Sequence, residues 1–388
     1  MTSLQQARAV AYEIGCRRIG APQTVPLSGA LGYTLAAAAT AQATVPTTDT
    51  SAMDGWVVSG PGPWRLDGTV TMGALPGPPL APGRARTVTT GGAVPPGAAA
   101  VLRAEHGDLH GDRLLGLAGR PASPGSDIRR AGEEIRVGDL LAPAGTPVTP
   151  PVAAAAAVAG LDELTVYPAP RAALVLLGDE VIDSGVPAPG QVRDAFAIAL
   201  PAILATQGVS ITDITRVQDD RDAVRAALTR NDVDVIITTG GTGHGRCDHL
   251  VPAVGETGGV IRVRGVDIRP GHPTVLAQLG HVPVIGLPGN PFAAVAALLT
   301  IGSPLIAGLI GQPSPSLQRR VSGQDFSGVT RGTRLVAVRE VAGELFAVER
   351  QGAAMITGLI DADALAVIEP SGALAGQSVQ AIPMPWIH

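Results

Sequence analysis

Three short segments of the sequence combine glycines with side chains that bind anions or metal ions. They are Gly178-Asp179-Glu180, the stretch from Gly240-Gly241-Thr242-Gly243 to Asp248, and Pro288-Gly289-Asn290. Each follows an apolar run typical of a strand buried on both faces. Ligands bind outside the carboxyl ends of the strands in an open parallel sheet, so we expect the three segments to converge there. Taken singly, each segment also fits a structural turn or a helix cap.

The residue types divide the chemistry between them. Glycines let backbone N–H groups approach an anion, and the N-termini of the following helices add positive potential. We expect Glu180 and Asp248 to share an oxygen-liganded Mg²⁺ that bridges the protein to a phosphate. The Gly-x-Gly-x-x-Gly spacing of dinucleotide-binding folds is missing, as are the Gly-x-Ser-x-Gly and His-Glu-x-x-His motifs of serine hydrolases and zinc proteases.

Two other segments are candidates for anion binding or acid chemistry. Arg269-Pro270-Gly271-His272-Pro273 places a cation and an imidazole around a rigid turn, which suits a small oxyanion or a solvated turn equally well. Ser51-Ala52-Met53-Asp54-Gly55-Trp56 places one acid between a methionine and an aromatic residue, and by itself Asp54 reads as a turn residue.

Composition excludes several classes of protein. The 388 residues include 28 basic residues, all of them Arg, and the absence of Lys rules out a Walker A phosphate loop and Schiff-base lysine chemistry. The net charge of −5 argues against nucleic acid as a partner. Cys16 and Cys247 stand far apart and in no metal-binding spacing, which indicates a cytoplasmic protein without a disulfide framework.

The elements needed to position these residues fall into four predicted domains. Residues 1–44 and 128–168 show helical spacing and form an N-terminal linker domain, into which a small β domain of residues 45–127 is inserted. Residues 169–312 alternate apolar strands with helices, which predicts a doubly wound α/β domain with a parallel sheet. Residues 313–388 return to short strands and form a C-terminal β domain. The fold class is thus a multidomain α/β protein.

One uncharged segment, residues 292–310, approaches the length of a membrane span. Asn290 and Pro291 open it as a helix cap and first turn, and Gly302, Ser303 and Pro304 interrupt it. We therefore interpret it as a buried or interface helix, and we expect no membrane partner.

Taken together, the motifs resemble the MoeA and gephyrin E-domain family, the molybdopterin molybdenumtransferases. The resemblance runs through nearly the whole chain in order. Besides the segments above, it rests on Thr90-Gly91-Gly92-Ala93-Val94-Pro95-Pro96-Gly97 with Glu105, and on Arg129-Arg130-Ala131-Gly132-Glu133-Glu134-Ile135.

The resemblance implies an elongated homodimer whose α/β domain is MogA-like and whose C-terminal domain is similar to a β-barrel. It also implies a reaction that takes adenylated molybdopterin and molybdate, with Mg²⁺, and releases AMP and molybdenum cofactor. The family's cleft lies between the α/β domain of one subunit and β domains of the other. A molybdopterin adenylyltransferase and acceptor molybdoenzymes are the protein partners it suggests.

The resemblance also assigns roles to individual residues. Glu180 and Asp248 would serve Mg²⁺, and Asp54, brought across the dimer with Thr90, would assist attack on the phosphoanhydride. The three molybdate-binding residues would be Arg269, His272 and Arg339. The remaining substrate contacts would come from Thr90, Glu134, Asp179, Gly240, Gly241, Thr242, Gly243, Pro288, Gly289 and Asn290.

The chain departs from the family's pattern at several positions. Leu177 stands where Thr is usual, Ala195-Phe196 where Thr-Asn or Ser-Asn is usual, and Arg269 and His272 where two lysines are usual. Ala353 or Ala354 takes the place of a Ser in the last domain. The alternative is therefore a catalytically impaired paralogue that acts as a dimeric pterin-binding or protein-scaffold module; a related pterin- or nucleotide-binding hydrolase is the third interpretation.

Overall fold

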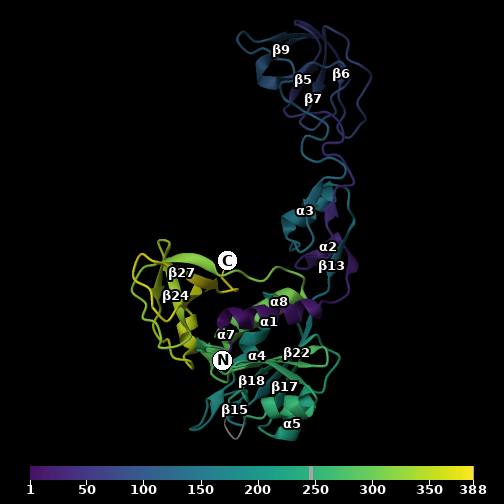
Figure 1. Cartoon of the computed structure of the whole chain (residues 1–388). Helices are drawn as coiled ribbons and strands as arrows, with labels where there is room; N and C mark the ends of the chain where they lie inside the picture. Colours follow the sequence, from purple (N-terminus) through teal and green to yellow (C-terminus); the bar gives the residue numbers. More distant parts are fainter. Residues whose placement is uncertain (244–247, 388) are drawn as a thin grey trace.

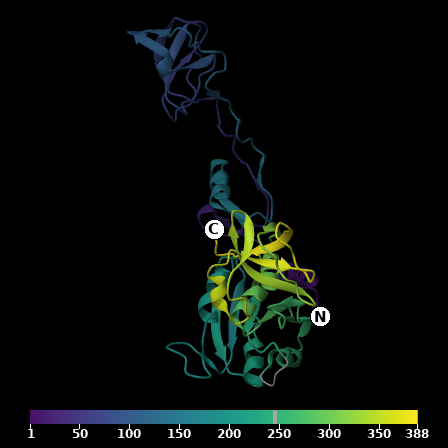
Figure 2. The same ribbon diagram turned by 90° about the vertical axis from the view of Figure 1, so that its left-hand side faces the viewer.

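The chain is elongated and has a folded unit at each end. The structure, a computed structural model, describes residues 1–243 and 248–387. A β-rich unit lies at one end, a narrow connection follows, and an α/β body with a C-terminal barrel beside it forms the other end (Figure 1). The view turned by 90° shows the same separation (Figure 2).

The α/β body is built on one six-stranded sheet. Its strands, in spatial order, are β17 (Ser210–Val217), β14 (Arg171–Leu177), β18 (Val235–Thr239), β22 (Val282–Leu287), β21 (Val275–Leu279) and β19 (Val260–Arg264). The first four are parallel, as the alternating pattern predicts. Two further strands that the pattern does not predict, β21 and β19, extend this parallel sheet in antiparallel pairing. β21 returns to β22 through the two residues Gly280 and His281, with Gly280 at a φ of 59°.

Helices cover both faces of this sheet, which makes the domain doubly wound. One face packs against α4 (Phe196–Ala205), and the other against α5 (Arg221–Leu228) and α6 (Leu250–Glu256). Asp220 caps α5 by accepting a hydrogen bond from the N–H of Ala223 at 2.9 Å.

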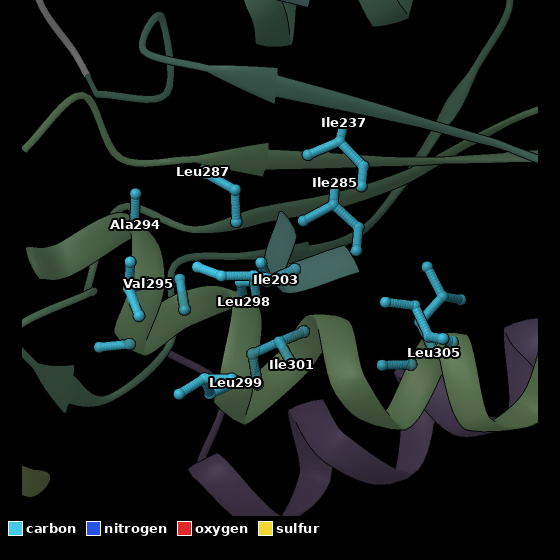
Figure 3. Close-up of a cluster of buried hydrophobic side chains, with 14 of the residues drawn as sticks. Ile203, Ile237, Ile285, Leu287, Ala294, Val295, Leu298, Leu299, Ile301 and Leu305 are labelled. Atoms are coloured by element: carbon cyan, nitrogen blue, oxygen red, sulfur yellow. The ribbon is translucent and has the colours of Figure 1, made fainter. Parts of the chain in front are cut away.

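The uncharged segment forms one long helix in the core. It consists of α7 (Pro291–Ala297), a π-helical turn η2 (Leu298–Gly302) and α8 (Ser303–Leu309). By length and composition this helix would be able to cross a membrane, yet 94% of it is buried inside the chain. Figure 3 shows its apolar side chains packed between the sheet and the N-terminal helix. The prediction of a buried or interface helix is therefore confirmed in its first form, because the chain itself buries this helix.

The N-terminal helix α1 (Leu4–Arg17) covers the outer side of this core helix. Its buried side, which includes Leu4, Ala7, Ala11 and Ile14, packs on α8 and η2. Pro304 has no N–H to donate to the carbonyl of Thr300, four residues earlier. The Arg8 guanidinium donates to this carbonyl at 3.0 Å and also to the carbonyl of Pro315.

A slender module connects this body to the distal β unit. It contains a sheet of β1 (Gln23–Pro26), β13 (Glu163–Tyr167) and β2 (Thr34–Leu35), with α2 (Leu27–Ala30) and α3 (Pro150–Val158). The chain passes from this module to the distal unit and back through two antiparallel strand pairs. They are β3 (Ala39–Thr40) with β12 (Leu140–Ala142), and β4 (Thr50–Ser51) with β11 (Ile128–Arg129). The distal unit is therefore an insertion within this module.

The distal unit is a six-stranded sheet with apolar side chains on both faces. In spatial order its strands are β8 (Ala100–Arg103), β5 (Gly55–Val58), β7 (Arg84–Val88), β6 (Trp64–Thr69), β10 (Arg113–Gly116) and β9 (Gly107–His110), with the short helix η1 (Ala104–His106) between β8 and β9. One face buries Val58, Trp64 and Leu114 and the other buries Val57, Val88 and Val101.

The C-terminal region is a closed barrel of five strands. They are β24 (Thr333–Val341), β25 (Glu344–Ala347), β23 (Gln318–Ser322), β27 (Ser378–Pro383) and β26 (Ala364–Ile368), and β26 closes the ring on β24. The expected barrel-like C-terminal domain is confirmed. β20 (Ile268–Arg269), which comes from the α/β body, adds to β24 and joins the two units.

Candidate functional site

The carboxyl ends of β14, β18 and β22 meet at one edge of the α/β sheet. Leu176 lies opposite Thr239, and Thr239 lies opposite Leu287, so the three strands end at the same level. The segments that follow them line one cavity of about 570 Å³. Its lining includes these residues predicted from the sequence: Glu180, Gly240, Gly241, Thr242, Gly243, Asp248, Pro288, Gly289 and Asn290.

The glycines of this cavity are required by its geometry. Gly240 and Gly241 have φ angles of 79° and 65°, in the left-handed region that favours glycine. The N–H of Gly243 donates to Asp248 Oδ1 at 2.9 Å, and a Cβ on Gly243 would lie 2.8 Å from Asp248 Oδ2. The first part of the loop is thus held against Asp248. His244, Gly245, Arg246 and Cys247 of the same motif lie outside the described residues.

Three acidic side chains lie close together at the carboxyl ends of β14 and β17. Asp219 follows β17 and lines the cavity with Glu180, while Asp179 lies beside both. Burial raises the pKa of Asp219, and the negative charges of Asp179 and Glu180 raise it further. The N–H of Asp179, at 3.5 Å from Asp219 Oδ2, opposes this shift. Sequence reasoning missed Asp219, although its place at the end of a strand parallel to β14 was a usable signal.

These carboxylates suit a magnesium ion that shares its ligands with a substrate. Within residues 1–243 and 248–387, no three His, Cys, Asp or Glu side chains form a group that would hold a metal by themselves. Mg²⁺ does not require such a group, because it usually keeps several waters and binds one or two carboxylates together with phosphates. Glu180 and Asp248 on the wall of one cavity meet that requirement.

Asp54 and Thr90 lie together in the distal unit. Asp54 Oδ1 accepts hydrogen bonds from the N–H of Thr90 at 2.7 Å and from its hydroxyl at 2.9 Å. These bonds, the backbone one first, lower the pKa of Asp54. Gly55 fixes the position of Asp54, since a Cβ on Gly55 would lie 2.1 Å from the carbonyl oxygen of Leu102. The result is an exposed carboxylate, fixed in place and held ionised.

Within one chain, this pair is remote from the cavity. Asp54 comes directly before β5 and Thr90 comes shortly after β7, and Figure 1 places both strands at the opposite end of the molecule from β17 and β18. A single chain therefore does not bring Asp54 to Glu180 and Asp248. Glu134 is exposed in the connecting module, where its N–H donates to the carbonyl of Val45.

The three residues predicted to bind molybdate do not meet at one point. Arg269 on β20 lies opposite Arg334 on β24. Arg339 is five residues further along β24, roughly 16 Å away, and an odd separation puts it on the opposite face of the strand. Arg339 lines a different cavity of about 490 Å³ in the barrel, together with Arg350 and Asp361.

His272 lies closer to the main cavity than Arg339 does. Its neighbour Pro273 lines that cavity, and so does Ala354 from the C-terminal region. His272 Nδ1 is 2.8 Å from the carbonyl oxygen of Val266, so the imidazole donates from Nδ1. In the neutral ring Nε2 is then an acceptor, which repels an oxyanion until the ring is protonated.

Comparison with known families assigns two parts of the chain. Residues 2–160 match the family described as MoeA N-terminal region (domain I and II), and residues 173–308 match a probable molybdopterin binding domain.

Named relatives extend the similarity over most of the chain. Molybdopterin molybdenumtransferase 2 of Mycobacterium tuberculosis is 32% identical over 343 residues, which are 81% of each chain. Molybdopterin molybdenumtransferase of Bacillus subtilis is 29% identical over 390 residues, covering 94% of this chain and 90% of that protein. The crystal structure of a molybdopterin biosynthesis moeA protein from Pyrococcus horikoshii has a TM-score of 0.81 at 20% identity, covers 98% of this chain and 99% of its own, and supports the fold.

Proposed function

Because this chain belongs to the family of molybdopterin molybdenumtransferases, we propose that it inserts molybdate into adenylated molybdopterin and releases AMP in a Mg²⁺-dependent reaction. The observation that carries the proposal is one cavity whose wall includes Glu180, Asp248 and the backbone of residues 240–243. A phosphoanhydride needs both: N–H groups for its oxygens and carboxylates for the cation that neutralises it.

The described residues divide the work of binding and reaction. In the loop of residues 240–243, the N–H groups of Gly241 and Thr242 would bind the phosphate oxygens. Those of Gly240 and Gly243 hold the loop in place by donating to the carbonyl of Leu287 and to Asp248. A bound Mg²⁺ would neutralise charge on the phosphate oxygens while Glu180 and Asp248 hold it. Release of AMP adds one water across the P–O–P bridge of the substrate. The ionised Asp54 accepts a hydrogen bond from this water and orients it toward phosphorus, and the bridging oxygen leaves, so that AMP and molybdopterin phosphate are the two products.

The proposal requires two subunits. Asp54 lies at the far end of its own chain, so we place it against the cavity of a second copy, where the distal unit of one chain meets the α/β body of the other. A two-fold dimer of this kind carries two equal sites, each built from both chains.

A second candidate function is a scaffold that has kept the fold without turnover. The departures favour it. Phe196 lines the cavity where the family has a polar side chain, Ala353 or Ala354 takes the place of a Ser, and His272 replaces a lysine next to the cavity. A pure scaffold has no need for three carboxylates and a glycine cradle at one sheet edge, which is why we place this candidate second.

One experiment separates the two candidates. The purified protein is incubated with adenylated molybdopterin, Mg²⁺ and graded molybdate, and AMP is followed by chromatography. Molybdate-dependent AMP release supports the transferase. Pterin binding without AMP at any molybdate concentration refutes it and favours the scaffold.

A further inference from the structure

A two-point ion pair lies beside the loop that carries Asp54. Arg103, at the end of β8, donates from Nε and Nη2 to the two carboxylate oxygens of Asp127, each at 2.9 Å. The Asp127 side chain is only 19% exposed, so the pair is partly shielded from water. Two parallel N–H···O bonds fix the orientation of both partners, which a single contact does not.

Asp127 has a backbone conformation that the surrounding structure must hold. Its φ of 55° lies in the left-handed region, which residues other than glycine adopt infrequently. Its carbonyl oxygen accepts a hydrogen bond from the N–H of Ala52 at 2.8 Å, and the next residue, Ile128, pairs with Ser51. Conformations of this kind persist where neighbouring interactions determine them, and they cluster at functional sites. The start of the loop of residues 51–54 is therefore held by Asp127.

The end of the same loop is held by the strand that carries Arg103. Arg103 lies opposite Gly55 in the pairing of β8 with β5. The residue after it, Ala104, donates its N–H to the carbonyl oxygen of Asp54 at 2.9 Å. The backbone of the loop thus has a fixed contact on each side of the Asp54 side chain.

These contacts form a closed ring around the backbone of Asp54. Ala52 is bound to Asp127, Asp127 is bound to Arg103, and Ala104, next to Arg103, is bound to Asp54. Two of these three links are backbone hydrogen bonds, and the third is the ion pair. The position of the loop therefore depends on two side chains that a substitution is able to remove.

We propose that Arg103 and Asp127 are positioning residues for Asp54, whose ion pair holds the loop of residues 51–54 so that the carboxylate points into the cavity of the second subunit. This inference rests on the proposed function, since it concerns a carboxylate that acts in that reaction. A misplacement of about 1 Å at a reacting group costs on the order of 100-fold in rate. The pair thus affects turnover through the geometry of Asp54.

The surroundings of Arg103 argue against a direct role in binding substrate. Its guanidinium lies between two acids, with Asp127 at 2.9 Å and Glu105 Oε1 at 4.0 Å from Nη1. The hydrogen bond to Asp127, and then its negative charge, raise the pKa of Arg103. A phosphate group would have to displace an acid from this cation. Loss of the pair should therefore lower kcat and leave KM nearly unchanged.

The first experiment measures kcat and KM for AMP release by the full chain. Arg103→Met keeps the apolar stem and removes both donors, and we expect kcat to fall roughly 10- to 100-fold with KM within about twofold of the wild type. Asp127→Asn tolerates the left-handed conformation but lacks the charge, so it should lower kcat similarly. The double variant should be no slower than the slower single variant, because either substitution removes the pair. Arg103→Lys keeps the charge without the two-point contact and should give an intermediate kcat, which decides the matter if Arg103→Met does not fold.

The second experiment separates positioning from a general structural role. In a chain that already carries Asp54→Ala, Arg103→Met should leave the residual single-turnover rate unchanged, because no carboxylate is left to position. Arg65→Met is the matched control: it removes the exposed ion pair with Asp112 in the same sheet and should keep the wild-type kcat. The proposal is overturned if Arg103→Met has the wild-type kcat, if KM rises instead, or if the rate falls equally in both backgrounds.

Hydrogen exchange at the N–H of Ala52 distinguishes the failure of this inference from the failure of the proposed function, because it is measured without turnover. This N–H should exchange faster in Arg103→Met than in the wild type or in Arg65→Met. Faster exchange in a protein that never releases AMP would retain the link between the pair and the loop and refute the transferase. AMP release with exchange and kcat both unchanged in Arg103→Met would refute the link and retain the transferase.

Discussion

The carboxylate of Asp54 and the N–H and hydroxyl of Thr90, 36 residues apart in the sequence, form two hydrogen bonds of 2.7 and 2.9 Å. The antiparallel pairing of β5 with β7 sets this contact, because Gly55 lies opposite Val88 and the chain then turns at Thr90. Two motifs that are far apart in the sequence thus form one structural unit. In it, the hydrogen bonds from Thr90 fix the position of the Asp54 carboxylate and lower its pKa.

This unit predicts a shift in the acidic limb of the pH–rate profile. The pKa of Asp54 is depressed in the folded protein, so activity that needs its carboxylate is retained as the pH falls until that low pKa is reached. Thr90→Val removes the hydroxyl donor, keeps the N–H donor, and raises the pKa of Asp54 part of the way to its ordinary value. The loss of kcat/KM should then begin at a higher pH. Thr90→Ser, which retains both donors, should keep the wild-type profile, and identical profiles for Val and Ser would contradict this role.

The metal assignment predicts the loss of turnover in two conservative variants. Glu180→Gln and Asp248→Asn remove charge with little change in volume, and each should lower the Mg²⁺-dependent rate by on the order of 100-fold or more. AMP release is measured against Mg²⁺ concentration, with Glu344→Gln on exposed β25 as the control. Full activity in both variants would remove the metal site from the proposal.

The need for two subunits predicts complementation between inactive variants. In a mixed dimer of Asp54→Ala and Glu180→Gln chains, one site receives both substitutions and the other receives neither. Equal amounts of the two chains, unfolded and refolded together, should therefore recover about a quarter of the wild-type activity, since half of the dimers are mixed and each has one intact site. Each variant refolded alone is the control, and a mixture as inactive as its components would show that the sites do not cross subunits.

The replacement of a lysine by His272 predicts weak use of molybdate. A lysine at this position carries a positive charge, whereas the imidazole donates from Nδ1 to the carbonyl of Val266 and, in its neutral form, presents an acceptor at Nε2. His272→Lys should lower the molybdate concentration for half-maximal activity several-fold. His272→Gln, which introduces no charge at any pH, should leave that molybdate concentration unchanged. An unchanged molybdate dependence in the lysine variant would place His272 outside the oxyanion site.

The contact between α1 and the core helix predicts a stability effect far from the site. Arg8→Met removes the donors to the carbonyls of Thr300 and Pro315, and leaves the buried carbonyl of Thr300 unpaired at a cost of about 1–3 kcal/mol. Urea unfolding measures this loss. Arg17→Met on the exposed side of the same helix should change the free energy of unfolding by less than about 0.5 kcal/mol. Equal effects of the two substitutions would argue that Arg8 acts through helix propensity alone.

Local patterns in the sequence predict much of the α/β domain. Residues 172–177 read as a strand buried on both faces and form the centre of β14, and Asp220 caps α5 as its position before the helical repeat suggests. These two features depend on residues close together in the sequence, where periodicity and capping are informative. The barrel-like form of the C-terminal domain is implied instead by the resemblance to the family, which rests on the order of motifs along the chain.

The features that the sequence did not predict depend on pairing over long distances. Nothing in the apolar run of β21 distinguishes antiparallel from parallel pairing with β22, and α1 shows helical spacing without indicating that its partner is α8. The contact of Asp54 with Thr90 requires the strand register, and the separation of Arg339 from Arg269 requires the barrel. In each case the deciding interaction joins segments that only the folded chain brings together.

The packing of α1 on the core helix also has a consequence for biosynthesis. Arg8 and Thr300 are separated by 292 residues, and a ribosome that adds roughly 5–20 residues per second needs about 15–60 s between them. During that time the apolar side of α1 has no native partner, so it is a natural target for chaperones that recognise nascent chains. The α/β body is completed only late in translation, although its first helix is among the first segments to emerge.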